Sequence, residues 1–128
     1  LNKGKLGFNF GLQGIQFTAT STTAESKSLA SSMYLESIPC NNDNQDIVSM
    51  GSNSASKTFD VLENGFQVAS ILATAIVEAS DFLEDENDMS TSMKSFKGEI
   101  RKHIPEIDKD LSYVKELKSV QEYLKNIK

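Results

Sequence analysis

Residues 55–83 read ASKTFDVLENGFQVASILATAIVEASDFL. Apolar side chains recur in this stretch at spacings of three and four residues, which is the period of one face of an α-helix. The series is Phe59, Leu62, Phe66, Ala69, Leu72, Ile76, Ala79 and Leu83. It predicts a long amphipathic helix whose apolar face must be covered by another helix.

We expect this helix to run from about residue 54 to 102, because the pattern continues through Met89, Met93 and Phe96. Ser52, Asn53 or Ser54 is expected to cap its first turn. Gly65 and Gly98 each disfavour a helix interior by roughly 1 kcal/mol relative to alanine. A kink or a break near residues 87–91 is therefore the alternative to one continuous rod.

Shorter elements are expected on either side of the long helix. Thr22 and Glu25 fit a capping box, which predicts a helix over about 23–37, and the Asn- and Ser-rich stretch 40–53 predicts a loop. Pro105 favours the first turn of a last helix that continues to Asn126 with a spacing close to a coiled-coil repeat.

The expected fold class is all-α, a helical hairpin with a long second helix plus an additional C-terminal helix. Residues 1–19 form an irregular or extended segment with a weak strand signal, 20–103 the hairpin, and 104–128 the C-terminal amphipathic helix. A chain of 128 residues is the size of one ordinary domain. The longest apolar run, 68–77, is about half the roughly 20 residues that a membrane-spanning helix needs, so no transmembrane segment is expected.

Charge is unevenly distributed along the chain, whose formal net charge is -5. Residues 51–93 carry one basic and eight acidic side chains. Phosphate binding requires a concentrated basic surface, so we expect no nucleic-acid partner. The acidic group Glu78, Asp81, Glu84, Asp85, Glu86 and Asp88 lacks the ligand spacing of a calcium loop and is interpreted as a solvated helix face.

Catalytic chemistry has little support in the sequence. His103 is the only histidine and Cys40 the only cysteine, and neither lies in a recognisable nucleophile or metal-binding motif. No glycine-rich phosphate loop is followed by lysine and serine or threonine. We therefore expect a protein that is not an enzyme, with no catalytic residues, no cofactor and no metal.

Phe82 and Glu86 are one i, i+4 step apart near the end of the long helix, so both side chains would share a face that a receptor can bind. The alternative is that Phe82 belongs to the core and Glu86 faces solvent.

The stretch from Ser49-Met50-Gly51-Ser52-Asn53-Ser54-Ala55 to Phe82-x-x-x-Glu86 resembles the small helical proteins of the WXG superfamily, in particular those encoded beside LXG toxins. The resemblance implies a helical hairpin without a catalytic site, exported by type VII secretion together with another helical protein. It implies that Phe82 and Glu86 form an export motif. The chain departs from the family pattern in lacking Trp-x-Gly and in having glutamate at 86.

The resulting functional hypothesis is a type VII secretion partner that binds the helical domain of a toxin or effector and is secreted without a cleaved signal peptide, or is cytoplasmic before export. Its partner-binding surface would comprise Phe59, Leu62, Phe66, Ala69, Leu72 and Ile76. The alternatives are a cytosolic immunity protein or chaperone that binds a toxin, and a structural helical protein that self-associates.

Overall fold

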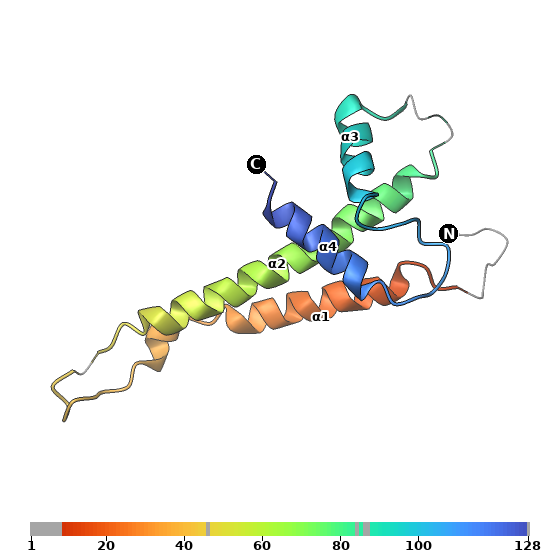
Figure 1. Ribbon diagram of the computed structural model, residues 1–128. Helices are drawn as coiled ribbons and strands as arrows, with labels where there is room; N and C mark the ends of the chain where they lie inside the picture. The colour runs from red at the N-terminus through yellow and green to blue at the C-terminus, as the bar shows by residue number, and fades with distance from the viewer. Residues whose placement is uncertain (1–8, 46, 84, 86–87, 128) are drawn as a thin grey trace.

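The computed structural model describes residues 9–45, 47–83, 85 and 88–127 (Figure 1). Within these residues it has four α-helices, one short 3-10 helix and no named β-strand, and an isolated bridge joins Cys40 to Gln45. The expected all-α class is confirmed. No helix in this described part is both long enough and apolar enough to cross a bilayer.

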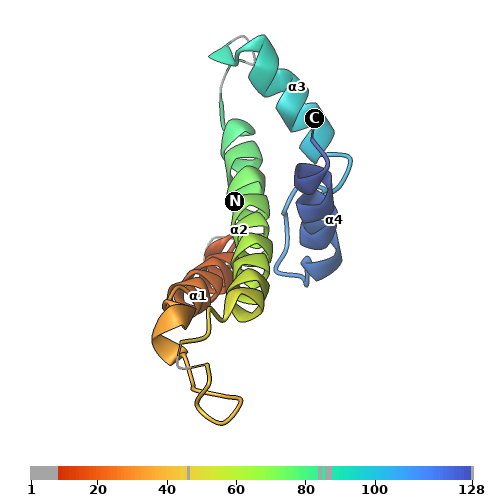
Figure 2. The same ribbon diagram turned by 90° about the vertical axis from the view of Figure 1, so that its left-hand side faces the viewer.

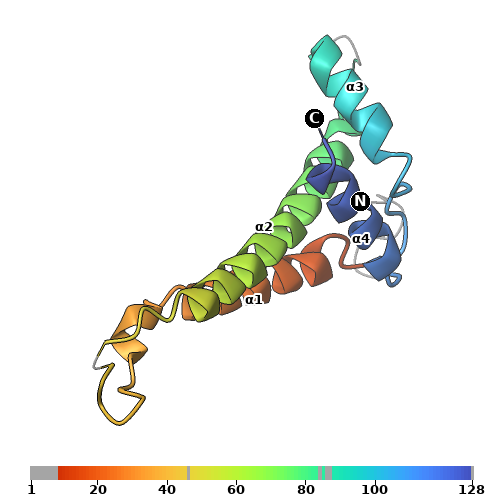
Figure 3. The same ribbon diagram turned by 60° about the vertical axis from the view of Figure 1, so that its left-hand side comes forward.

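Two helices form the long axis of the molecule. Helix α1 spans Gln13–Leu29 and helix α2 spans Gly51–Ser80. They lie side by side in opposite directions and are joined by the 3-10 helix η2, Met33–Glu36, and by loop 37–50 (Figure 1). Figure 3 shows this loop extending beyond the ends of both helices.

Helix α1 begins ten residues before the predicted start at 23, so the expectation of irregular structure is wrong for residues 13–19. Its hydroxyl side chains donate to carbonyls of the preceding turn, for example Thr20 to Gln16 at 3.1 Å and Thr23 to Ala19 at 2.8 Å. These bonds satisfy hydroxyl groups inside the helix. Thr22 is buried in the middle of α1 and is therefore not the cap of a helix that begins at 23.

Helix α2 also begins earlier than predicted, and its expected cap is absent. The residue before it, Met50, has φ 49 and makes no side-chain capping bond, whereas Ser52, Asn53 and Ser54 are inside the helix. Left-handed backbone at Met50 turns the chain directly into the first helical turn. Asn41, Asn42 and Asp43 also have positive φ, which agrees with the predicted loop.

A continuous helix to residue 102 is wrong, because α2 ends at Ser80 and the next helix, α3, spans Thr91–Ile100. The break begins before the expected 87–91, in a stretch of like charges that repel along a helix. The side chain of Ser90 starts α3 by accepting a hydrogen bond from the backbone N–H of Met93 at 3.2 Å.

Helix α4 spans Val114–Lys125, so the last helix does not begin at Pro105. In the connection 101–113, residues 101–104 make backbone hydrogen bonds to the end of α3, and two further backbone groups are bound by side chains. The guanidinium of Arg101 donates to the Pro105 carbonyl at 2.9 Å, and the Ile107 N–H donates to Glu78 at 3.2 Å. These bonds compensate for the helical hydrogen bonds that this connection lacks.

The core lies where the C-terminal half of α2 meets α3, α4 and the connection between them. Figure 2 shows α1 on one side of α2, with α3 and α4 on the other. Small side chains at Ser70, Ala73 and Thr74 let other elements approach α2 closely, and all three are buried. The core cluster consists of Ala73, Val77, Ile100, Ile104, Ile107 and Val120.

Candidate functional site

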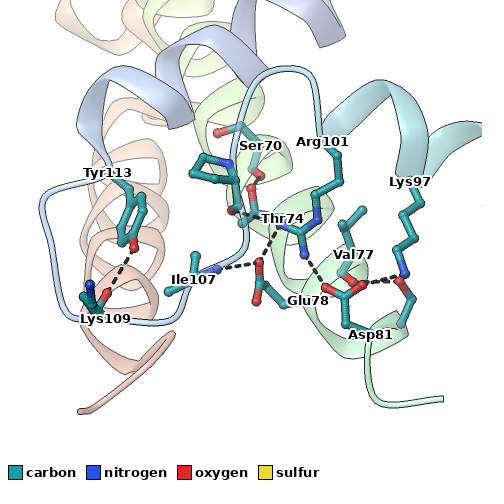
Figure 4. Close-up of polar contacts among 12 residues, drawn as sticks. Ser70, Thr74, Val77, Glu78, Asp81, Lys97, Arg101, Ile107, Lys109 and Tyr113 are labelled. Carbon is teal, nitrogen blue, oxygen red and sulfur yellow. Dashed lines mark hydrogen bonds and ion pairs between the residues drawn. The ribbon is translucent and has the colours of Figure 1, made fainter. Parts of the chain in front are cut away.

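Charged side chains from α2 and α3 meet beside the core (Figure 4). Arg101 donates to Glu78 at 2.7 Å and also to Asp81, and Lys97 pairs with Asp81 at 2.5 Å. Glu78 is only 6% exposed, so its charge requires compensation. The carboxylate that binds Arg101 also accepts the Ile107 N–H, which fixes the chain after α3 against α2.

This arrangement corrects the interpretation as a solvated face for Glu78 and Asp81, whereas Asp85 and Asp88 are exposed and Glu84 and Glu86 lie outside the described residues. Partial burial acts to raise the pKa of Asp81, but the hydrogen bonds from Lys97 and Arg101 outweigh burial and hold that pKa below its ordinary value. Two cations therefore match two carboxylates in a structural network. The i, i+4 spacing of Lys97 and Arg101 is the signal by which the sequence could have indicated it.

Tyr113 faces the same region from the start of α4, and its hydroxyl donates to the Lys109 carbonyl at 3.1 Å (Figure 4). Burial first, and then the negative charges of Asp108, Glu78 and Glu116, raise the pKa of the Tyr113 phenol. The hydrogen bond to Lys109 ties the Tyr113 side chain to the backbone just before α4.

An apolar groove of about 830 Å³ runs between the first half of α1 and the second half of α2. Its walls are largely aliphatic and aromatic. The lining residues include Phe10, Leu12, Leu72, Glu78, Phe82 and Ile107. A concave surface with few polar groups is typical of a place where another apolar element or a ligand binds.

The predicted partner-binding residues lie on α2, and most remain accessible. Phe59 is 64% exposed, Leu62 57%, Leu72 59% and Ile76 43%. Phe66 and Ala69 are partly buried. As a surface available to a partner, this set stays a prediction.

The proposed export motif does not have the geometry on which it depended. Phe82 is 52% exposed and lies after the end of α2 at Ser80, so it is not on a helix face. Glu86 lies outside the described residues. The prediction that the Phe82 side chain lies on a helix face is therefore wrong.

His103 and Cys40, the only histidine and the only cysteine of the sequence, each contact a nearby side chain. His103 Nδ1 is 2.8 Å from the Ser119 hydroxyl, and its ring contacts that of Tyr123 with centroids 5.0 Å apart, so it joins the end of α3 to α4. Cys40 is exposed in loop 37–50, where its thiol donates to Gln45 at 3.3 Å. No group of three potential metal ligands occurs in this described part of the chain.

Comparison with known proteins identifies the family of this chain. Residues 1–102 match the model of a protein family described as aromatic amino acid lyase. The chain belongs to the aromatic amino acid lyase family.

The relatives of this lyase-family chain are much longer than the chain itself. It is 44% identical over 80 residues to tyrosine 2,3-aminomutase of Myxococcus fulvus, covering 62% of this chain and 15% of that protein. It is 35% identical over 99 residues to tyrosine 2,3-aminomutase of Chondromyces crocatus, covering 77% and 18%. It is 30% identical over 119 residues to histidine ammonia-lyase of Bacillus cereus strain G9842, covering 93% and 23%.

A solved structure supports the same assignment. The crystal structure of tyrosine aminomutase from Streptomyces globisporus is similar to this chain with a TM-score of 0.85 and 29% sequence identity. The similarity covers 92% of this chain and 22% of that one. The lyase-family chain thus spans about a fifth of the length of the relatives that it matches.

Several expectations are corrected by these findings. The resemblance to the WXG superfamily is wrong, because the family match and the structural neighbour are both of the aromatic lyase and aminomutase type. The secretion-partner and immunity-protein hypotheses are wrong for the same reason. The expectation of a non-enzymatic class is also wrong, since the relatives are named as enzymes.

Proposed function

We propose that this chain supplies a helical scaffold segment of an enzyme that breaks the bond between the amino nitrogen and carbon 2 of an amino acid with an aromatic side chain. The observation that carries the proposal is the family match over residues 1–102. A histidine ammonia-lyase releases ammonia from histidine, and a tyrosine 2,3-aminomutase moves the amino group of tyrosine between carbons 2 and 3. Both reactions share the cleavage of that bond.

Tyrosine is the substrate that we propose first. The identity to the Myxococcus fulvus tyrosine aminomutase is 44%, against 30% to the Bacillus cereus histidine ammonia-lyase. The structural neighbour with TM-score 0.85 is also a tyrosine aminomutase.

The scaffold role is supported by the amount of apolar surface that the chain leaves uncovered. On α2 alone, Phe59, Leu62, Leu72 and Ile76 are between 43% and 64% exposed. Leu72 and Phe82, beside the groove between α1 and α2, are both more than half exposed. A surface of this kind is covered when other helices of a larger protein pack on it.

The chemical groups of the described residues also support a scaffold role. An elimination needs a base that takes a proton and an acid or electrophile that assists the leaving amine. His103 is engaged with Ser119 at the junction of α3 and α4, and the Tyr113 hydroxyl is bound to the Lys109 carbonyl. We therefore propose that other parts of the enzyme supply most of the reacting groups, and that this chain positions them.

The direct test is an assay of the intact protein that carries this chain. L-tyrosine and L-histidine are supplied separately, with ammonia release measured by a coupled assay and β-tyrosine measured by chromatography. We expect turnover of L-tyrosine in preference to L-histidine, and none of the D-enantiomers, because a chiral site orients the cleaved bond. Turnover of neither L-amino acid by correctly folded protein would contradict the proposed function.

A further inference from the structure

A carboxylate near the end of the chain holds the segment that leads into α1. Asp110 Oδ2 accepts the backbone N–H of Phe10 at 2.7 Å, and Oδ1 accepts that of Gly11 at 3.1 Å. The two partners in the first bond are 100 residues apart in sequence. Close by, the side-chain amide of Asn9 donates to the Asp108 carbonyl at 3.4 Å.

The start of α1 has no local substitute for this carboxylate. Leu12 makes no side-chain capping bond, and the first turn contains no acidic residue. Gly11 has φ 59, so its N–H is directed by a left-handed turn that glycine adopts readily. A carboxylate placed here binds two N–H groups at once and also interacts favourably with the positive end of the helix dipole.

A second carboxylate holds the same connection from the opposite side. Glu78 of α2 accepts the Ile107 N–H at 3.2 Å and the Arg101 guanidinium at 2.7 Å. Ile104 is 0% exposed and Ile107 6%, so the part of the connection beside Glu78 is anchored in the core. Figure 1 shows this connection running from α3 towards the start of α1 before it enters α4.

We propose that Asp110 and Glu78 act together as a clasp, through which residues 9–11 and residues 107–110 attach and detach together. Phe10 and Gly11 line one part of the groove between α1 and α2, and Ile107 and Glu78 line another. The state of the clasp therefore determines whether this end of the groove is closed. Asp110 is a positioning residue, since it acts on the backbone at Phe10 and Gly11.

Hydrogen exchange of individual amides in the intact protein tests the clasp. In Asp110→Ala, two charge-assisted bonds are lost, so the Phe10 and Gly11 amides should exchange at least about tenfold faster. The Ile107 amide, which Asp110 does not touch, should also exchange faster by a comparable factor. Asp110→Asn keeps one acceptor and should give smaller changes of the same kind.

The reciprocal variant and a matched control complete the test. Glu78→Gln should accelerate exchange at Phe10 and Gly11, and Asp108→Ala should not, because Asp108 contributes only its backbone carbonyl there. Unchanged exchange at Ile107 in both Asp110 variants would overturn the proposal, since the two attachments would then be independent. Uniform acceleration through α2 in all variants would also overturn it, because that is the result of general unfolding.

Discussion

At the scale of single residues, charged side chains of this chain are neutralised by partners that are distant in sequence. Glu78 and Asp81 belong to an acidic stretch, yet Arg101 and Lys97 neutralise them beside a core of aliphatic side chains. Removing either partner of a buried pair leaves an uncompensated charge, which is far more costly than the pair itself. The network is therefore a structural requirement for the contact between α2 and α3.

This requirement predicts a loss of stability in acid. The pKa of Asp81 is lowered from 3.8 by Lys97 and Arg101 against the opposing effect of burial. Because the unfolded chain binds the proton first, the stabilisation is complete well above pH 3.8 and declines as the pH falls through the lowered pKa. The free energy of unfolding, measured by urea denaturation between pH 6 and pH 2, should decrease over that range.

Asp81→Asn is the control for this prediction. The variant has no carboxylate at 81, so it should be less stable at pH 6 and should lose less stability on acidification. Equal pH dependence of the two proteins would show that Asp81 does not contribute.

At the scale of elements, backbone and side-chain hydrogen bonds determine where each helix begins and ends. Ser90 supplies a cap for α3, whereas Met50 starts α2 through left-handed backbone without any cap. Helix α2 has glycine at position 65, where an added Cβ would meet nothing within 4 Å. The buried residues of α2 all lie between Ser70 and Ser80, so its stability depends mainly on packing of its C-terminal half.

Gly65→Ala should stabilise α2. Alanine loses less backbone entropy on folding and has open space at this position, so the free energy of unfolding should rise by about 0.5–1 kcal/mol. Thermal unfolding monitored by circular dichroism measures the change. Gly11→Ala provides the contrast, because Gly11 has φ 59 and alanine there should be destabilising. A stabilised Gly11→Ala variant would show that this left-handed turn is not formed.

At the scale of the whole molecule, the chain has one core and a large apolar surface that this core does not cover. Ile100, Ile104 and Val120 are completely buried, whereas Leu72 and Ile76 on the same long helix as the buried Val77 remain accessible. We expect a hairpin with apolar groups on both sides to pack against other helices on its free side. This arrangement agrees with a chain that spans about a fifth of its relatives.

Leu72→Asp should have a small effect on the stability of this chain and a large effect on the activity of the intact enzyme. Leu72 is 59% exposed here, so the variant should change the stability of the chain itself by only about 0.5 kcal/mol. In the intact protein the same charge would lie in an apolar helix contact, and activity should fall at least about tenfold. Urea denaturation of this chain and the tyrosine assay of the intact protein measure the two effects.

Ser56→Asp, on an exposed polar position of the same helix, is the matched control and should leave both measurements near the wild-type values. Full activity of the intact Leu72→Asp protein would show that this face of α2 remains in solvent.

The sequence by itself determined the helical class and the presence of a long amphipathic helix, because a period of three and four residues is a local property of the chain. It also indicated a loop, which was predicted over 40–53 and ends at Met50 in the structure. The apolar series that includes Leu72 and Ile76 stays a prediction as a partner-binding surface. It did not indicate the enzyme family, since the described residues contain no complete catalytic motif and short patterns such as Phe82-x-x-x-Glu86 recur by chance.

Only the tertiary structure decided which apolar and charged groups are buried together. Residues 105–113 carry a helical pattern, yet they are not helical. Glu78 binds the Ile107 N–H from 29 residues away, and Asp110 binds the Phe10 N–H from 100 residues away. Helix α1 likewise begins where a carboxylate from the far end of the chain meets the backbone at Phe10 and Gly11. Such long-range bonds outweigh local propensity, and their partners cannot be paired from sequence spacing alone.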